Sequence, residues 1–317
     1  MRVAVLGLGS AGARHGRLLR ELGHEPVGFD PAVEGGAPSL EQALDGADAA
    51  VVASPNRLHA EQALAAVQAG CAVLVEKPLA VDLADADRLV AAASRAGRPC
   101  GVAMNLRFHA GVLTLRRLLD EGALGRVLTA EVVFGYDLRR WRPDTDYRRS
   151  YSARRDLGGG ILLDAIHELD YAGWLLGPAV DVDARCARLS DLAIDVEDTV
   201  LASVGLASGA LLSVRLNFHE PAYRRGCHLV GTEATATWDW VAETVVVRRT
   251  EAPEETIDAR CPVQETYRAE LEDFVAAVVE GRAPRTSLAE GRDALALCDA
   301  IRRAAATGQR TRVSPAP

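Results

Sequence analysis

The sequence lacks long apolar segments and any segment typical of a secretory signal. None of its apolar runs approaches the roughly 20 residues that a membrane-spanning helix needs. The chain starts directly with a strand-like run from Arg2, without the apolar core and cleavage site of a signal peptide, so we expect a cytoplasmic protein. The net charge of -8 argues against non-specific binding to nucleic acids or membranes.

Closely spaced cysteines are also absent. The six cysteines lie far apart and none belongs to a C-x-x-C pair, so the pattern suggests neither a zinc site nor a disulfide framework. We expect reduced, mostly buried thiols and no metal site.

Lysine is nearly missing. Of the 36 basic residues, Lys77 alone is lysine and the rest are arginine. Arginine cannot release its proton in a protein, whereas a lysine ammonium can. Lys77 is therefore a candidate for proton chemistry, with chance survival as the alternative.

The first third of the chain alternates short apolar runs with helix-like segments. This alternation is typical of a parallel sheet covered on both faces by helices. The predicted strands are 3–8, 25–29, 49–53, 72–75 and 100–104, and the predicted helices are 11–22, 58–69, 83–96 and 111–119.

After residue 125 the pattern changes to strands separated by short turns, which indicates a large, mostly antiparallel sheet. The predicted strands are 127–134, 182–189, 199–206, 210–217, 228–230, 235–240 and 244–248, the helices are 160–176, 266–280 and 288–307, and the tail 308–317 is expected to be mobile. We predict an α/β protein with a dinucleotide-binding domain over 1–122 and a second α/β domain over 123–317, whose closing helices can pack back on the first domain.

A glycine-rich loop lies between the first predicted strand and the first predicted helix. In this context Gly7, Gly9 and Gly12 form the G-x-G-x-x-G pattern of a Rossmann domain, and the helix N-terminus at Ser10 and Ala11 offers N–H groups to phosphates. Asp30 ends the second strand, where a carboxylate accepts hydrogen bonds from ribose hydroxyls and repels a 2′-phosphate. The loop predicts NAD as cofactor, with NADP less favoured and an Asp-Pro turn as the alternative role of Asp30.

Four segments together resemble the Gfo/Idh/MocA family, named for glucose–fructose oxidoreductase and inositol dehydrogenase. They are Gly7–Gly12, Ser54–His59, Glu76–Pro78 and Gly158–Asp170, in the family's order and spacing. The resemblance covers essentially the whole chain. It implies a Rossmann domain followed by an α/β domain with an open sheet that commonly mediates dimers or tetramers.

The resemblance also implies that Lys77 faces the reacting hydroxyl and manages its proton together with His167. A hydride leaves a carbinol carbon only as the hydroxyl proton is withdrawn, so a base or an alkoxide-stabilising group is needed. Asp164 lies three residues before His167 on the same predicted helix and thus on the same face. It can orient the histidine, bind a substrate hydroxyl or bond nearby backbone. Because better-known members carry Asp-x-x-x-His, the carry-over to His167 is more direct than that to Asp164.

Further site residues follow from their places at strand ends, since ligands bind outside the carboxyl ends of parallel strands. For His59 the alternative is a helix N-terminal residue that caps or packs. We assign cofactor binding to Gly7, Gly9, Ser10, Ala11, Gly12, Asp30, Ser54, Asn56, His59, Glu76 and Asn105. We assign substrate binding to Arg107, Trp141, Arg142 and Tyr151.

The segment 139–155 is rich in arginine, with Trp141 and Tyr151 interleaved. Arginine forks bind phosphate and carboxylate bidentately, which favours an anionic sugar-like substrate. A solvated loop that pairs with the surplus acidic residues at a subunit interface is the alternative.

The sequence therefore predicts an NAD-dependent oxidoreductase acting on a carbinol or keto carbon of a sugar, sugar nucleotide or cyclitol. Two alternatives stay open: an NAD-cycling lyase, hydrolase or imine reductase of the same fold, and a non-catalytic NAD-binding regulatory protein. We expect a homodimer or homotetramer.

Overall fold

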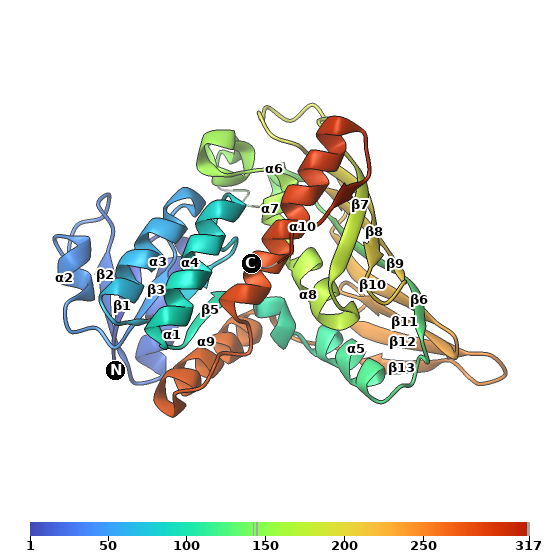
Figure 1. Ribbon diagram of the computed structural model, residues 1–317, viewed down its shortest axis with the longest axis horizontal. Coiled ribbons are helices and arrows are strands. Elements are labelled where there is room, and N and C mark those ends of the chain that lie inside the picture. The colour runs from blue at the N-terminus through green and yellow to red at the C-terminus, as the bar shows by residue number, and fades with distance from the viewer. Residues whose placement is uncertain (142, 144, 316–317) are drawn as a thin grey trace. The chain divides into compact units, whose positions relative to one another are not determined.

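The computed structural model describes residues 1–141, 143 and 145–315, which form two compact units (Figure 1). The first unit contains 1–105 and 267–295, and the second contains 106–266 and 296–315. The division falls before the predicted boundary at 122/123, because α5 (Ala110–Asp120) packs on strands and a helix of the second unit.

Five parallel strands form the sheet of the first unit. They are β1 (Arg2–Leu6), β2 (Glu25–Phe29), β3 (Ala49–Val52), β4 (Ala72–Glu76) and β5 (Cys100–Ala103), and they pair in the order β2-β1-β3-β4-β5. The valines, alanines and leucines of β1, β3 and β4 are almost wholly buried, as expected for strands covered on both faces. The strand order reverses between β1 and β3, and ligands bind at the carboxyl ends beside such a switch point.

Helices cover both faces of this sheet. They are α1 (Ser10–Glu21), α2 (Leu40–Leu44), α3 (His59–Gln68), α4 (Leu83–Ala96) and α9 (Val263–Glu280), with short 3-10 turns η1 (Asn56–Leu58) and η2 (Asn105–Phe108) after β3 and β5. Leu18 and Leu19 of α1 pack with Leu271 and Phe274 of α9 against the valines of β1. The closing helix α9 thus completes the core of the first unit.

Nine strands form the sheet of the second unit. They are β6 (Val127–Gly135), β7 (Ala179–Ala187), β8 (Thr199–Leu206), β9 (Leu211–Asn217), β10 (Arg224–Gly231), β11 (Ala234–Asp239), β12 (Thr244–Arg249), β13 (Glu255–Asp258) and β14 (Thr311–Arg312), in the order β13-β12-β11-β10-β6-β9-β8-β7-β14. Only β6 and β9 pair in parallel among these described strands. The predicted large, mostly antiparallel sheet is confirmed.

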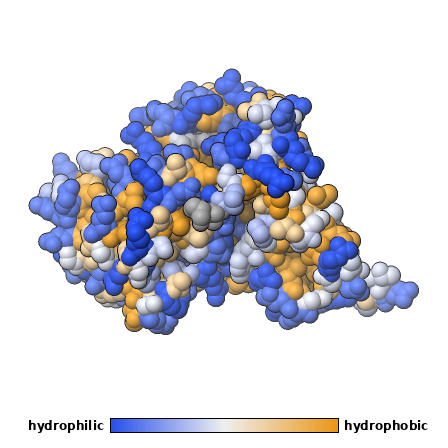
Figure 2. All heavy atoms as spheres, in the orientation of Figure 1, coloured by the Kyte–Doolittle hydropathy of each residue, from blue (hydrophilic) through white to orange (hydrophobic). Residues whose placement is uncertain are grey.

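Helices lie along one face of this sheet, as Figure 1 shows for α5 and α8. The remaining elements are α6 (Leu138–Trp141), α7 (Ile161–Asp164), α8 (Ile166–Leu176), α10 (Leu288–Thr307) and the 3-10 turns η3 (Tyr147–Arg149), η4 (Tyr151–Ala153) and η5 (Arg155–Leu157). On the opposite face Leu201 and Leu211 are 51% and 55% exposed. Figure 2 shows hydrophilic and hydrophobic residues interspersed over the face of the molecule that it draws.

Two local predictions were wrong. The predicted helix 160–176 is broken at Ala165, where φ is -94° and ψ is 28°. The tail expected to be mobile contains β14, in which Thr311 pairs with Val182 of β7. No helix in the described part of the chain is long and apolar enough to cross a membrane.

Candidate active site

The glycine loop has two tight positions and one open position. A Cβ atom at Gly12 would lie 1.8 Å from the Gly7 carbonyl oxygen, and one at Gly7 would lie 2.5 Å from the Ser54 nitrogen. A Cβ at Gly9 would meet nothing within 4 Å. Gly7 and Gly12 therefore let the chain pack closely, whereas Gly9 leaves space that a ligand can approach.

The N-terminus of α1 follows this open position. Gly9 is its N-cap, so no side chain caps Ser10, Ala11 and the rest of the first turn. Uncapped N–H groups and the positive end of the helix dipole favour an anion such as a phosphate.

Asp30 braces the glycine loop. Its Oδ2 accepts a hydrogen bond from the Leu8 nitrogen over 2.8 Å, and its Oδ1 accepts one from Ala32 over 2.9 Å. The turn role is thus observed, and the remaining lone pairs of the carboxylate can still accept ribose hydroxyls.

Ser54 and Asn56 follow β3 at its carboxyl end. The Ser54 hydroxyl is buried and has no hydrogen-bond partner among the described residues. A buried hydroxyl without a partner is unfavourable, so a ligand atom that completes it would be stabilised. The open Gly9, the uncapped α1 and the Ser54 hydroxyl all fit the phosphates and ribose of a dinucleotide.

Lys77 follows β4 directly, and Glu76 fixes its backbone. The Glu76 carboxylate accepts hydrogen bonds from Arg14 over 3.0 Å, from His15 over 2.9 Å and from the Lys77 nitrogen over 3.3 Å. Burial would raise the pKa of Glu76, but the hydrogen bond from His15 and the neighbouring positive charges lower it to about 2. Glu76 is therefore an anion at neutral pH and is engaged by the protein itself.

His59 contacts the backbone just after Lys77. Its Nδ1 lies 2.7 Å from the Pro78 carbonyl oxygen and its Nε2 lies 2.9 Å from that of Ser54. Burial lowers the pKa of His59, and a neutral imidazole carries one N–H, so one of the two carbonyls receives a hydrogen bond. The ring links the segments after β3 and β4, which matches the packing alternative rather than the assigned cofactor contact.

Asp164 and His167 are both buried, but they belong to different helices. Asp164 ends α7 and His167 is the second residue of α8, with the break at Ala165 between them. The predicted continuous helix that would carry both residues is therefore wrong, and the relation between the two side chains stays a prediction.

Arg107 and Asp170 form a bidentate ion pair. Arg107 Nε donates to one carboxylate oxygen over 2.8 Å, and Nη2 donates to the other over 2.6 Å. The side chains are 2% and 1% exposed. The predicted substrate contact of Arg107 thus needs correction, because its guanidinium is committed to α8.

Arg225 and Glu168 form a second buried pair, which the sequence did not predict. Arg225 Nε lies 2.7 Å from Glu168 Oε1, and its guanidinium lies 4.4 Å from the Phe134 ring centroid. Burial would lower the pKa of Arg225, but the Glu168 carboxylate raises it above its ordinary value.

Most described arginines of the segment 139–155 are bonded within the second unit. Asp137 binds Arg139, Asp146 binds Arg148 and Asp156 binds Arg154, each through a chain separation of two residues. Arg142 lies outside the described residues. Such local pairing favours the solvated-loop alternative over an anion site.

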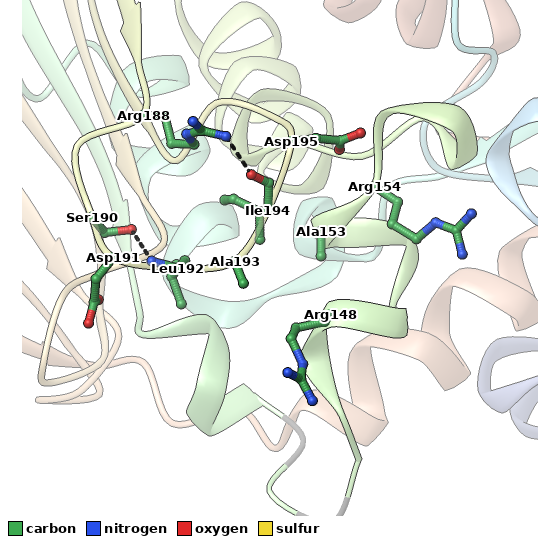
Figure 3. Close-up of a pocket in the computed structure, with 10 residues that line it drawn as sticks. All are labelled: Arg148, Ala153, Arg154, Arg188, Ser190, Asp191, Leu192, Ala193, Ile194 and Asp195. Carbon is green, nitrogen blue, oxygen red and sulfur yellow. Dashed lines mark hydrogen bonds between the residues drawn. The ribbon is translucent and has the colours of Figure 1, made fainter.

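A pocket of about 430 Å³ lies beside this segment (Figure 3). Its lining also argues against an anion site. Arg148, Arg154 and Arg188 line it together with Asp191 and Asp195. Figure 3 shows Arg148 and Arg154 pointing in different directions, while Arg188 donates to the Ile194 carbonyl over 2.8 Å. The positive charges do not converge on one point.

Trp141 packs edge-on against Phe134 and Phe218, with ring centroids 5.6 and 5.3 Å away. Its indole N–H is buried without an acceptor among the residues that the structure describes. Tyr151 begins η4 in the same unit, and Asn105 begins η2 in the first unit, where it is buried.

Sequence reasoning missed Arg14 and His15, although a signal existed. His15 lies on the apolar face of α1 with Leu18 and Leu19, where a wholly buried polar residue needs a partner. No comparable local signal marked Arg225, since its partner lies 57 residues away in the chain.

Comparison with known proteins identifies the family. The model of the oxidoreductase family with an NAD-binding Rossmann fold matches residues 1–104, and that of the GFO/IDH/MocA C-terminal domain matches 112–237. Inositol 2-dehydrogenase 2 of Saccharopolyspora erythraea is 31% identical over 100% of this chain and 96% of its own length. The chain belongs to the GFO/IDH/MocA family.

Other GFO/IDH/MocA relatives agree with this assignment. The 1,5-anhydro-D-fructose reductase of Ensifer adhaerens is 32% identical over 83% of this chain and 78% of its own. A levoglucosan dehydrogenase solved with NADH superposes with a TM-score of 0.87 at 23% identity, covering 99% of both chains. The predicted family, fold and NAD cofactor are confirmed, and the protein is an NAD-binding oxidoreductase.

Proposed function

We propose that this protein is an NAD-dependent dehydrogenase or reductase that acts on a carbinol or keto carbon of a neutral sugar or cyclitol. The observation that carries the proposal is Lys77. It is the only lysine of the chain, it follows the carboxyl end of β4, and its backbone is fixed by Glu76 on one side and, through Pro78, by His59 on the other.

NAD supplies the hydride acceptor, or NADH the hydride donor, of this reaction. When NAD is bound, the α1 N-terminus would hold its pyrophosphate, Asp30 its adenosine ribose, and Ser54, Asn56 and Asn105 further cofactor atoms. Of the pair Lys77 and His167, one accepts the hydroxyl proton during oxidation and returns it during reduction, while the other stabilises the negative charge that develops on the oxygen, which lowers the barrier by general acid–base catalysis. Asp164 orients His167 or binds a substrate hydroxyl, and Trp141 and Tyr151 contact the substrate.

A neutral substrate is favoured over an anionic one for two reasons. The described arginines of the segment 139–155 are largely bonded to aspartates or carbonyl oxygens of the chain. The relatives with 31% and 32% identity are named for inositol and anhydrofructose, which carry no charge.

The test measures the change in nicotinamide absorbance with a panel of substrates. The panel contains myo-inositol and levoglucosan with NAD⁺, 1,5-anhydro-D-fructose with NADH, and nucleotide sugars and sugar acids as the anionic compounds. Turnover of a neutral compound that disappears in Lys77→Met supports the proposal. Turnover of anionic compounds alone refutes the neutral class, and unchanged turnover in Lys77→Met refutes the role of Lys77.

We further propose a homodimer or homotetramer that associates through the exposed face of the nine-stranded sheet. Leu201 of β8 and Leu211 of β9 are about half exposed on that face. Light scattering of the Leu201→Asp, Leu211→Asp double variant should give a smaller mass than wild type. An unchanged oligomer would place the interface elsewhere.

A further inference from the structure

Helix α8 carries two buried ion pairs immediately after His167. Glu168 pairs with Arg225 of β10, and Asp170 pairs with Arg107 of η2. Three of these four side chains are at most 2% exposed, and Arg225 is 12% exposed. The two arginines come from segments 118 positions apart (225 − 107), so α8 is tied to two separate parts of the second unit.

Stability alone does not account for two such pairs. Removing charges from water is unfavourable, and apolar replacements of buried ion pairs are often as stable as the pairs themselves. A charged pair does, however, restrict orientation, because the bidentate fork of Arg107 fits one geometry of the Asp170 carboxylate.

The far end of α8 is held in a similar way. Arg116 of α5 donates to the carbonyl oxygens of Trp174 and Leu175, both over 3.2 Å. The helix is thus fixed at its C-terminus by one arginine and in its first two turns by two others. His167 is the second residue of the helix, next to Glu168 and three positions before Asp170, which bind Arg225 and Arg107.

We propose that Arg107 and Arg225 are positioning residues for His167. Through Asp170 and Glu168 they set the rotation and tilt of the first turns of α8, and hence the place of the imidazole. The proposal rests on the proposed proton-handling role of His167. Misplacing a catalytic group by about 1 Å can cost about 10²-fold in rate, so a loss of about 10-fold or more in kcat is expected when either fork is removed.

The test uses the full-length protein with Arg107→Lys and Arg225→Lys, which keep each charge but lose the planar fork. Arg292→Lys is the matched control, because Arg292 is 3% exposed and donates to Asp87 over 2.8 Å in the first unit. Histidines are labelled with ¹³C, and the His167 signal is identified as the one missing in His167→Gln. Thermal unfolding confirms that each variant is folded.

We expect the His167 signal to move in Arg107→Lys and Arg225→Lys and to stay in place in Arg292→Lys. Should one variant not fold, the other still decides the outcome, since it addresses a different pair. An unmoved His167 signal in the folded variants overturns the proposal.

Turnover is measured separately, with the panel substrate that wild type converts fastest. In the His167→Gln background, Arg107→Lys should lower kcat no further, because groups that act as one unit are not additive. A further equal loss in that background means that Arg107 acts otherwise and also overturns the proposal. Full activity of the His167→Gln single variant refutes the proposed function of His167. In that case the His167 signal of Arg107→Lys and Arg225→Lys still tests whether the two arginines position the imidazole.

Discussion

The two units hold their proposed reactive residues by different means. Lys77 has a long side chain that starts at a strand end, and the first unit fixes its backbone through Glu76 and, at Pro78, through His59. His167 has a short, rigid side chain on a helix, and the second unit fixes the helix through two buried ion pairs. In the first unit the contacts fix the backbone from which the reactive side chain starts, whereas in the second unit they fix the whole helix that carries the imidazole.

The largest expected effect tests whether both residues handle the same proton. We predict that Lys77→Arg and His167→Gln each lower kcat by about 10²- to 10⁴-fold, since arginine keeps the charge but cannot release a proton. The kcat of the double variant should be only slightly lower than that of the less active single variant. Steady-state kinetics measure this, with NADH binding by fluorescence as the control. Independent, multiplied losses would show that the residues act in separate steps.

The next prediction compares how much the carboxylates of Glu168 and Glu76 contribute to the free energy of unfolding. Glu168→Gln leaves the Arg225 charge buried without its partner and should cost about 3–5 kcal/mol. Glu76→Gln should cost less, about 1–2 kcal/mol, because Arg14 is 19% exposed and retains some hydration. Chemical denaturation measures both. Equal losses would remove the distinction between the two units.

The dependence of stability on pH at acid values tests the ionised state of Glu76. The pKa of Glu76 is lowered from 4.5 to about 2 in the folded protein. The unfolded chain therefore takes up this proton first, and the stabilisation by Glu76 is lost as pH falls from 4.5 towards about 2. The difference in melting temperature between wild type and Glu76→Gln should stay constant from about pH 7 to about pH 5 and shrink as pH falls further towards about pH 3. A difference that stays constant down to about pH 3 would contradict the ionised state of Glu76.

The smallest effect concerns His109, the N-cap of α5 in the second unit. Its Nδ1 accepts a hydrogen bond from the Gly111 nitrogen over 3.0 Å, so the ring must be neutral. Burial and the Arg225 charge lower the pKa of His109 from 6.5 to about 4, so its contribution is lost as pH falls through that window.

Asparagine at position 109 keeps a capping oxygen and cannot titrate. His109→Asn should lower stability at neutral pH by about 0.5–1.5 kcal/mol, because the ring contacts with Trp238 and Trp240 are lost, and should flatten the pH dependence between 6.5 and 4. Melting curves across this range measure the slope. A slope as steep as that of wild type would mean that other groups dominate.

The parts of the site that the sequence predicted depend on neighbours in the chain. The Gly7–Gly12 loop follows from a spacing that is local and sterically strict, and Lys77 stands out because no other lysine exists. The fold followed from the two hydrophobic periods of the chain.

The parts that it did not predict depend on distant partners. Arg107 reads as a free arginine in the sequence, and only the packing of η2 against α8 shows its bond to Asp170. The break at Ala165 is likewise hidden, because the residues around it are buried on every side and give no helical period. His59 was assigned to the cofactor, but its role depends on two carbonyl oxygens that no sequence pattern shows.

The nine-stranded sheet ends in short strands at both edges. β14 spans only Thr311–Arg312, and β13 spans Glu255–Asp258 with a charged residue at each end. Long, flat and apolar edge strands recruit strands of other molecules, and short or charged ones discourage this. The sheet can therefore offer its broad face to a second copy while resisting open-ended strand addition, which separates ordered assembly from aggregation.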